Sequence, residues 1–166
     1  MPAISVVIPA YNEEKYITAT LAALQKQTFA DYEVIVVANG CTDNTEPILK
    51  KKNSEKLRHL SLPQANVSVA RNAGALNAQG DILVFVDADT QLAEDSLQII
   101  KEEFTAEYSV ATTKTAPDTP SWKFKAALAF KNLSHQTKLY PGCSGVLVCR
   151  KQDFHAVDGY PPDMVV

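Results

Sequence analysis

The sequence predicts an α/β fold in which a mostly parallel central sheet is flanked by helices on both faces. Short runs of β-branched and other apolar residues, typical of buried strands, alternate with longer segments whose apolar residues recur at helical spacing. This alternation repeats from the N-terminus and indicates successive strand–helix–strand units. Because crossovers between parallel strands are right-handed, we expect the units to build three layers, α/β/α.

The expected strands are short, apolar and rich in valine and isoleucine. They are Ile4 to Pro9, Tyr32 to Ala38, Leu57 to Leu62, Ile82 to Asp87, Tyr108 to Thr113 and Gly145 to Arg150. The run ILVFV at 82–86 is apolar at every position, which is typical of a strand covered on both faces.

The expected helices lie between these strands, at about 13–27, 43–52, 67–78, 94–104 and 123–136. In the first helix, Ile17, Leu21 and Leu24 recur at helical spacing, and Asn12 is available as its N-cap. The third helix is rich in alanine and contains Gly74, so we expect it to lie close to the sheet. Gly80 is expected to end it.

Length and composition indicate one domain that binds neither nucleic acid nor a bilayer core. The chain has 166 residues and a net charge of −3, and its longest basic run is three lysines, so it offers no broad positive surface to a polyanion. No apolar segment approaches the roughly 20 residues that span a membrane. We therefore predict a cytoplasmic protein, for which peripheral membrane association stays open. Three cysteines without paired spacing are interpreted as free thiols.

Polar residues follow three of the expected strands at the point where each strand ends. These clusters are PAYNEE at 9–14, NGCTDNT at 39–45 and DAD at 87–89. In open parallel sheets, ligands bind beyond the carboxyl ends of the strands. We therefore expect the three clusters to meet at one edge of the sheet and to form the functional site.

Asp87 and Asp89 place two carboxylates directly after a buried strand. A divalent cation would neutralise their repulsion and would also bind phosphate oxygens. All-oxygen ligands favour Mg²⁺ or Mn²⁺ over zinc. The competing interpretation is structural, with Asp87 capping a turn and Asp89 capping the next helix. The two aspartates alone do not decide between these interpretations.

Four segments, taken in order, resemble the inverting glycosyltransferases of family two, which have the GT-A (Rossmann-like) fold. They read SVVIPAYNEEKYITATLAAL, YEVIVVANGCTDNT, ARNAGALNAQGDILVFVDAD and GCSGVLVCRKQDFHAVDGY. The resemblance implies metal-dependent transfer of a sugar, with inversion, from a nucleoside-diphosphate sugar to an acceptor hydroxyl. A UDP-sugar is the default donor and a GDP-sugar the alternative. Residues 1–115 would form the nucleotide-sugar-binding half, and residues 116–166 would begin an incomplete acceptor-binding half.

The segment after the first strand is implied by this resemblance to contact base and ribose, through Pro9, Tyr11, Asn12 and Glu13. Tyr11 can stack on a base, and Glu13 can accept hydrogen bonds from hydroxyl groups. The alternative is an ordinary strand-to-helix turn in which Asn12 only caps the helix.

Arg71, Asp87 and Asp89 are implied by the same resemblance to lie near the diphosphate. A guanidinium binds phosphate or ribose oxygens in a bidentate manner, although Arg71 could instead form an ordinary surface ion pair. Asp89 would be the direct metal ligand, and Asp87 would lie nearer the ribose and the metal.

Two departures from the family pattern affect the expected chemistry. Many members carry an acidic pair where this chain has Ala38 and Asn39, and an aspartate there binds the base, so the nucleobase stays open. The family usually presents an acidic motif, whose carboxylate is the general base, shortly after a segment like GYPPDMVV, and this sequence stops before any such motif. Asp158 and Asp163 are the carboxylates near this end, and Asp163 is kept as a candidate base although it does not align with the motif.

Two other classes of function are alternatives to this interpretation. A nucleotidyltransferase would normally show a glycine-rich, basic loop after the first strand, whereas this chain has the acidic PAYNEE. A non-catalytic nucleotide-sugar-binding domain, or a shortened inactive form of a longer enzyme, is favoured by the missing base. Measurable transfer of a sugar would exclude that second class.

Overall fold

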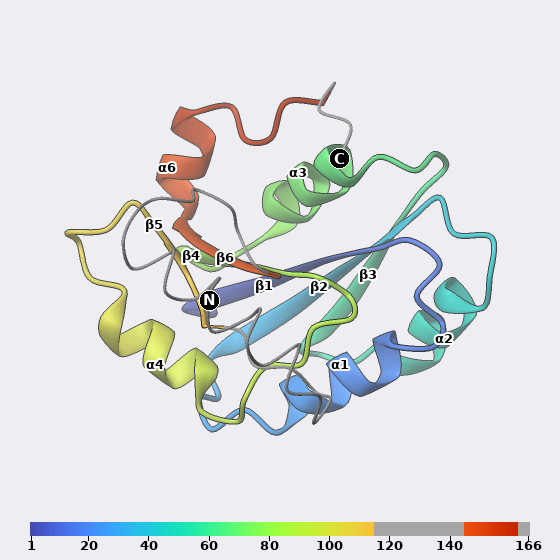
Figure 1. Cartoon of the computed structure of the whole chain (residues 1–166), viewed down its shortest axis with the longest axis horizontal. Coiled ribbons are helices and arrows are strands. Elements are labelled where there is room, and N and C mark those ends of the chain that lie inside the picture. Colours follow the sequence, from blue (N-terminus) through green and yellow to red (C-terminus); the bar gives the residue numbers. More distant parts are fainter. Residues whose placement is uncertain (115–144, 163–166) are drawn as a thin grey trace, which may run out of the picture.

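The computed structural model describes residues 1–114 and 145–162, which form a six-stranded sheet in the order β3-β2-β1-β4-β6-β5 (Figure 1). The strands are β1 (Ile4–Ala10), β2 (Tyr32–Asn39), β3 (Leu57–Leu62), β4 (Ile82–Val86), β5 (Val110–Thr112) and β6 (Val146–Arg150). Strands β1 to β4 are parallel, and β6 runs antiparallel to both of its neighbours, β4 and β5. The expected, mostly parallel sheet is confirmed.

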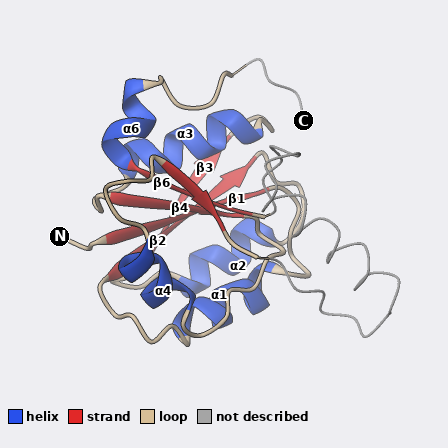
Figure 2. Ribbon diagram, turned by 60° about the vertical axis from the view of Figure 1, so that its left-hand side comes forward, coloured by secondary structure: helices blue, strands red, loops and turns tan. Residues whose placement is uncertain are grey.

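Helices cover both faces of the sheet, as Figure 2 shows. One face carries α1 (Ile17–Gln25), α2 (Thr45–Lys52) and α4 (Ser96–Glu103), and the other carries α3 (Val67–Asn77) and α6 (Lys151–Ala156). Alternate residues of β1 serve the two layers: Ile4, Val6 and Ile8 belong to the core beneath α1 and α4, and Val7 belongs to the core beneath α3. The three-layer α/β/α prediction is therefore confirmed. None of the helices in the described ranges is long and apolar enough to span a bilayer.

Helix α3 lies close to the sheet because it carries a glycine where it crosses β1. A Cβ atom added at Gly74 would lie 2.3 Å from Cγ1 of Val7, a distance that two carbon atoms cannot adopt. The expected close approach of this helix is confirmed. Gly80 does not end the helix, since α3 ends at Asn77; it allows a close approach, because a Cβ there would lie 2.8 Å from the backbone of Ile4.

The main differences from the sequence prediction lie at helix ends. Helix α1 begins at Ile17 rather than near Glu13, and its N-cap residue is Tyr16, so the prediction that Asn12 caps it is wrong. Asn12 instead adopts a left-handed conformation with φ 56°. Helix α6 was not predicted from the sequence.

Three of the sequence predictions concern residues outside the described ranges. They are the helix expected over 123–136, the thiol of Cys143 and the candidate base Asp163. Of the other two cysteines, Cys41 and Cys149 are free thiols as expected.

We predict that Gly74→Ala destabilises the protein because the new methyl group would collide with Val7. Overpacking of this kind costs about 1–3 kcal/mol, which exceeds the roughly 1 kcal/mol that alanine gains over glycine in a helix. Urea denaturation should show the loss. In a Val7→Ala background the same substitution should cost clearly less, and equal costs in the two backgrounds would contradict the proposed collision.

Candidate functional site

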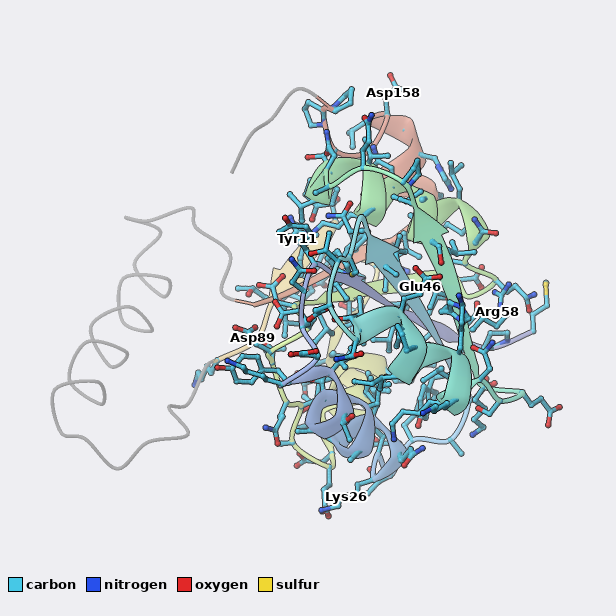
Figure 3. The ribbon with its side chains drawn as sticks, turned by 90° about the vertical axis from the view of Figure 1, so that its right-hand side faces the viewer. Tyr11, Lys26, Glu46, Arg58, Asp89 and Asp158 are labelled. Atoms are coloured by element: carbon cyan, nitrogen blue, oxygen red, sulfur yellow. The ribbon has the colours of Figure 1, made fainter. Side chains whose placement is uncertain are left out.

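The three polar clusters meet in one cavity of about 260 Å³ at the carboxyl ends of the parallel strands. Its lining consists of Pro9, Tyr11, Glu13, Asn39, Val67, Asp87, Ala88 and Asp89. Figure 3 shows Tyr11 and Asp89 at the same edge of the molecule. The expected convergence of the clusters is therefore found in the structure. Sequence reasoning missed Val67 and Ala88, which are apolar and carried no chemical signal.

The loop after β1 is braced against the loop after β2 by hydrogen bonds. Asn12 does not line the cavity; its Oδ1 accepts hydrogen bonds from the backbone N–H of Thr42 at 2.8 Å and from the Thr42 hydroxyl at 3.3 Å. The backbone N–H of Glu13 donates to Oγ1 of Thr45 at 2.7 Å. Asn12 tolerates the left-handed conformation that this loop requires, as asparagine commonly does. The structure therefore gives Asn12 a bracing contact.

Asn39 is buried at the floor of the cavity, and its amide orientation is fixed by a neighbour. Its Oδ1 accepts a hydrogen bond of 2.8 Å from the backbone N–H of Asn66, which precedes α3. Of the two ends of the Asn39 side-chain amide, only the oxygen can accept a hydrogen bond from a backbone N–H, so this contact assigns the orientation of the amide. Asn66 also caps α3, since its own Oδ1 accepts from the N–H of Val69 at 3.0 Å.

The turn that carries Asp87 and Asp89 is held from helix α1. The hydroxyl of Thr20, a buried residue of α1, donates to the carbonyl oxygen of Ala88 at 2.7 Å. The N–H of Thr90 donates to the carbonyl oxygen of Asp87 at 2.9 Å. Asp89 does not cap the following helix, because the N-cap of α4 is Asp95, so that structural alternative is wrong.

Arg71 reaches the cavity edge from α3 and pairs with Asp87. Its Nη2 donates to Oδ1 of Asp87 at 3.0 Å. The pair is partly buried, with 21% of the Arg71 side chain and 44% of the Asp87 side chain exposed. The ion pair considered from the sequence is therefore present, and it holds a cation beside the two aspartates. The buried Nε of Arg71 has no hydrogen-bond partner among the described residues.

The cavity carries an excess of negative charge, which is visible at Glu13. Burial raises the pKa of the Glu13 carboxyl above its ordinary value, and repulsion from Asp89, Asp43 and Asp87 raises this pKa further. A bound cation would relieve this repulsion. Within residues 1–114 and 145–162, no three or more His, Cys, Asp or Glu side chains are placed to hold a metal ion together.

Residues 5–147 match the sequence model of the family described as glycosyl transferase family 2. This match covers most of the chain. The chain belongs to glycosyl transferase family 2. Its fold is the GT-A fold, as the resemblance in sequence implied.

Two curated relatives of this family-2 chain match part of its sequence. The hyaluronan synthase of Pasteurella multocida is 32% identical over 117 residues, which cover 69% of this chain and 12% of that protein. The poly(ribitol-phosphate) β-N-acetylglucosaminyltransferase TarS of Staphylococcus aureus is 35% identical over 99 residues, or 57% of this chain and 17% of that protein. The matched segments are thus a small part of each relative.

Solved structures share the fold over nearly the whole chain. S. aureus TarS 1–349 in complex with UDP-GlcNAc aligns with a TM-score of 0.72 and 26% identity, covering 98% of this chain and 49% of that one. The mannosyltransferase PcManGT of Pyrobaculum calidifontis, in complex with GDP-Man and Mn²⁺, aligns with a TM-score of 0.79 at 22% identity, covering 98% and 48%. The second likeness shows the fold alone. This chain spans about half the length of both structures.

We predict that Glu13→Gln stabilises the protein at neutral pH when no metal is added. The raised pKa means that the folded state disfavours the Glu13 carboxylate, so the free energy of unfolding of the unsubstituted protein rises as pH falls through the raised value toward 4.5. Because Glu13 is partly exposed, the gain should stay below about 1 kcal/mol.

Urea denaturation in EDTA between pH 4 and 7.5 measures this effect. The advantage of the variant should shrink as pH falls and vanish near the pKa of the unfolded state. Glu55→Gln, at an exposed glutamate before β3, is the matched control and should leave stability unchanged at every pH. A Glu13→Gln advantage that does not change with pH would contradict the electrostatic explanation.

Proposed function

We propose that this chain binds a nucleoside-diphosphate sugar together with Mn²⁺ or Mg²⁺ in the cavity at the carboxyl ends of β1, β2 and β4. The reaction we propose is transfer of the sugar, with inversion, to an acceptor hydroxyl. The observation that carries the proposal is the cavity itself, in which an exposed aromatic ring, a buried amide and three carboxylates face one space. The named complexes of TarS with UDP-GlcNAc and of PcManGT with GDP-Man support a nucleotide-sugar ligand.

The nucleoside end of the ligand fits the side of the cavity formed by β1 and β2. Tyr11 is half-exposed there and offers a ring on which a base can stack, beside Pro9. The amide of Asn39 presents a polar group at the floor, and Glu13 can accept hydrogen bonds from ribose hydroxyls. We keep UDP as the default nucleotide and GDP as the alternative.

The diphosphate end fits the side formed by β4 and α3. Asp89, with Asp87 beside it, would hold the cation, and phosphate oxygens would complete its coordination. This assignment agrees with the raised pKa of Glu13, which reflects burial and the negative charge of the neighbouring aspartates. When bound, the cation supplies stabilisation of the negative charge on the leaving diphosphate.

The described residues account for the orientation of the ligand. Arg71 adds a second positive group at the diphosphate edge, and the Thr20 hydroxyl holds the turn that presents the aspartates. The acceptor hydroxyl needs a carboxylate to take its proton, and such a base contributes ~10²- to 10⁴-fold to rate. Asp163 is our candidate for this base in the present chain, and residues 1–115 are our proposed nucleotide-sugar half.

We predict that the chain binds UDP or GDP with Mn²⁺, and that Asp89→Asn lowers the affinity for the nucleotide in Mn²⁺ by at least about tenfold. The reason is the loss of one charged metal ligand, and the effect should be much smaller in EDTA. Isothermal titration calorimetry with each nucleotide, with and without Mn²⁺, measures both affinities. No heat for either nucleotide at protein concentrations of ~100 µM would count against the proposed function.

Asp81→Asn is the matched control for this experiment. Asp81 is an exposed aspartate that precedes β4, at the end of the strand opposite the cavity. Its substitution removes the same charge from the protein without touching the cavity. An equal loss of affinity in the two variants would show a general charge effect and would contradict the metal-ligand role of Asp89.

We predict that the chain binds the matching nucleotide sugar but releases UDP or GDP from it slowly, because Asp163 does not align with the motif that supplies the general base in the family. A coupled assay for released nucleotide, run with UDP-GlcNAc and GDP-Man, measures the activity. If activity is found, Asp163→Asn should lower kcat by at least about 10²-fold without a comparable change in KM. Unchanged kcat would remove Asp163 as the base.

A further inference from the structure

The chain after α6 turns back onto α3 through two residues in the left-handed conformation. Asp158 has φ 58° and Gly159 has φ 69°. A Cβ atom at Gly159 would lie 2.6 Å from Oδ1 of Asn72 and 2.9 Å from the ring of Phe154, so only glycine fits there. Figure 1 shows the segment after α6 crossing toward α3. We call residues 158–162 the C-terminal strap.

Two asparagines at α3 hold the C-terminal strap in place. The amide of Asn72 pairs with the backbone of Tyr160 in both directions: Nδ2 donates to the carbonyl oxygen at 2.8 Å, and Oδ1 accepts from the N–H at 2.9 Å. Nδ2 of Asn66 donates to the carbonyl oxygen of Pro162 at 2.8 Å. Asn66 is also the residue whose backbone N–H fixes Asn39, so the strap and the floor of the cavity share one neighbour.

The side chain of Tyr160 lies between the core and Arg71. Its ring packs edge-on against Phe85 of β4, with centroids 5.5 Å apart, and in a tilted arrangement against Phe154, with centroids 5.7 Å apart. The guanidinium carbon of Arg71 lies 5.1 Å from the centroid of the same ring. Arg71 is therefore held at two points, by the Tyr160 ring and by the carboxylate of Asp87.

The Tyr160 ring offers a favourable contact to a guanidinium whose hydrogen-bond donors are not all paired. The buried Nε of Arg71 has no hydrogen-bond partner among the described residues, and attraction to an aromatic face compensates part of the cost of burying a guanidinium. If a long side chain is no longer held in one rotamer, fixing it on a ligand costs additional conformational entropy. Removing the ring should therefore weaken contacts that depend on a fixed Arg71.

We propose that Tyr160 is a positioning residue, which holds Arg71 at the edge of the cavity so that the guanidinium is already placed for the diphosphate of a bound nucleotide. Tyr160 does not line the cavity and would not contact the nucleotide. This inference rests on the proposed function for its ligand. It extends the site from the polar loops after β1, β2 and β4 to the C-terminal strap.

The test uses variants of the whole chain and two ligands that differ only in the diphosphate. Tyr160→Leu removes the ring and keeps apolar volume, whereas Tyr160→Phe keeps the ring. By calorimetry with Mn²⁺, Tyr160→Leu should weaken UDP binding about three- to tenfold and leave uridine binding unchanged. Tyr160→Phe should bind both ligands like the unsubstituted chain. If GDP is the nucleotide bound, GDP and guanosine replace this pair.

Two further variants separate positioning from a general loss of packing. Phe154→Leu disturbs the same aromatic cluster without touching Arg71, and it should lower stability without a selective loss of UDP affinity. In an Arg71→Gln background, Tyr160→Leu should cause no further loss of UDP affinity. An equal loss for UDP and uridine, the same selective loss in Phe154→Leu, or an additive loss in the double variant would each overturn the proposal.

A measurement without ligand distinguishes failure of this inference from failure of the proposed function. The NMR signal of the Arg71 Nε–H should be sharp and slow to exchange in the unsubstituted chain and in Tyr160→Phe, and broadened or fast in Tyr160→Leu. If no nucleotide binds, the proposed function and the diphosphate role fail together, while this signal still decides whether Tyr160 holds Arg71. The same signal in all three proteins would overturn the positioning role by itself.

Discussion

The parallel pairing of β1 with both β2 and β4 is the constraint on which the site depends. Val7 lies opposite Ile35 on one side and Phe85 on the other, so the three strands run side by side and end at one edge. The loops that follow β1, β2 and β4 therefore begin close to one another. Because α1 and α2 return the chain over one face and α3 returns it over the other, a space opens between the loops at this edge. The cavity is thus a consequence of strand order.

This arrangement leaves an excess of negative charge in the cavity when no ligand is bound. Glu13 comes from the loop after β1, and Asp87 and Asp89 come from the turn after β4, yet the three share one space, and Arg71 compensates only part of their charge. Polar neighbours keep the loops fixed despite the repulsion: the hydroxyl of Thr20 holds one turn, and the amide of Asn12 holds another. A site prepared in this way favours a positively charged ligand or a complex that contains one.

The sequence was sufficient for the strands and for the convergence of the clusters, because both follow from local patterns. Apolar runs such as ILVFV are unambiguous as buried strands, and the polar residues after them are found where parallel strands place them. Helix boundaries were less accurate, since Asn12 has the composition of a cap but takes part in a contact with Thr42, 30 residues away. Such a contact leaves no periodic signal.

The contribution of Tyr160 could not be predicted for the same reason. The dipeptide DG at 158–159 signals a turn. The side of the sheet to which that turn returns depends on helix α6, which was not predicted from the sequence. Thr20 offered a weaker signal, as a hydroxyl on the buried side of a helix, between Ile17 and Leu21. Its partner, a backbone carbonyl 68 residues away, is visible only in the fold.

The placement of β6 has a consequence for how the chain comes to be folded during synthesis. β6 occupies the edge of β4 opposite β1, although more than half of the chain separates β6 from β1. Until residues 146–150 leave the ribosome, the amides and carbonyls along that edge of β4 lack their native partner, and an unpaired edge invites pairing with other chains. Among the described strands, the one made last is therefore the one that covers this edge of β4.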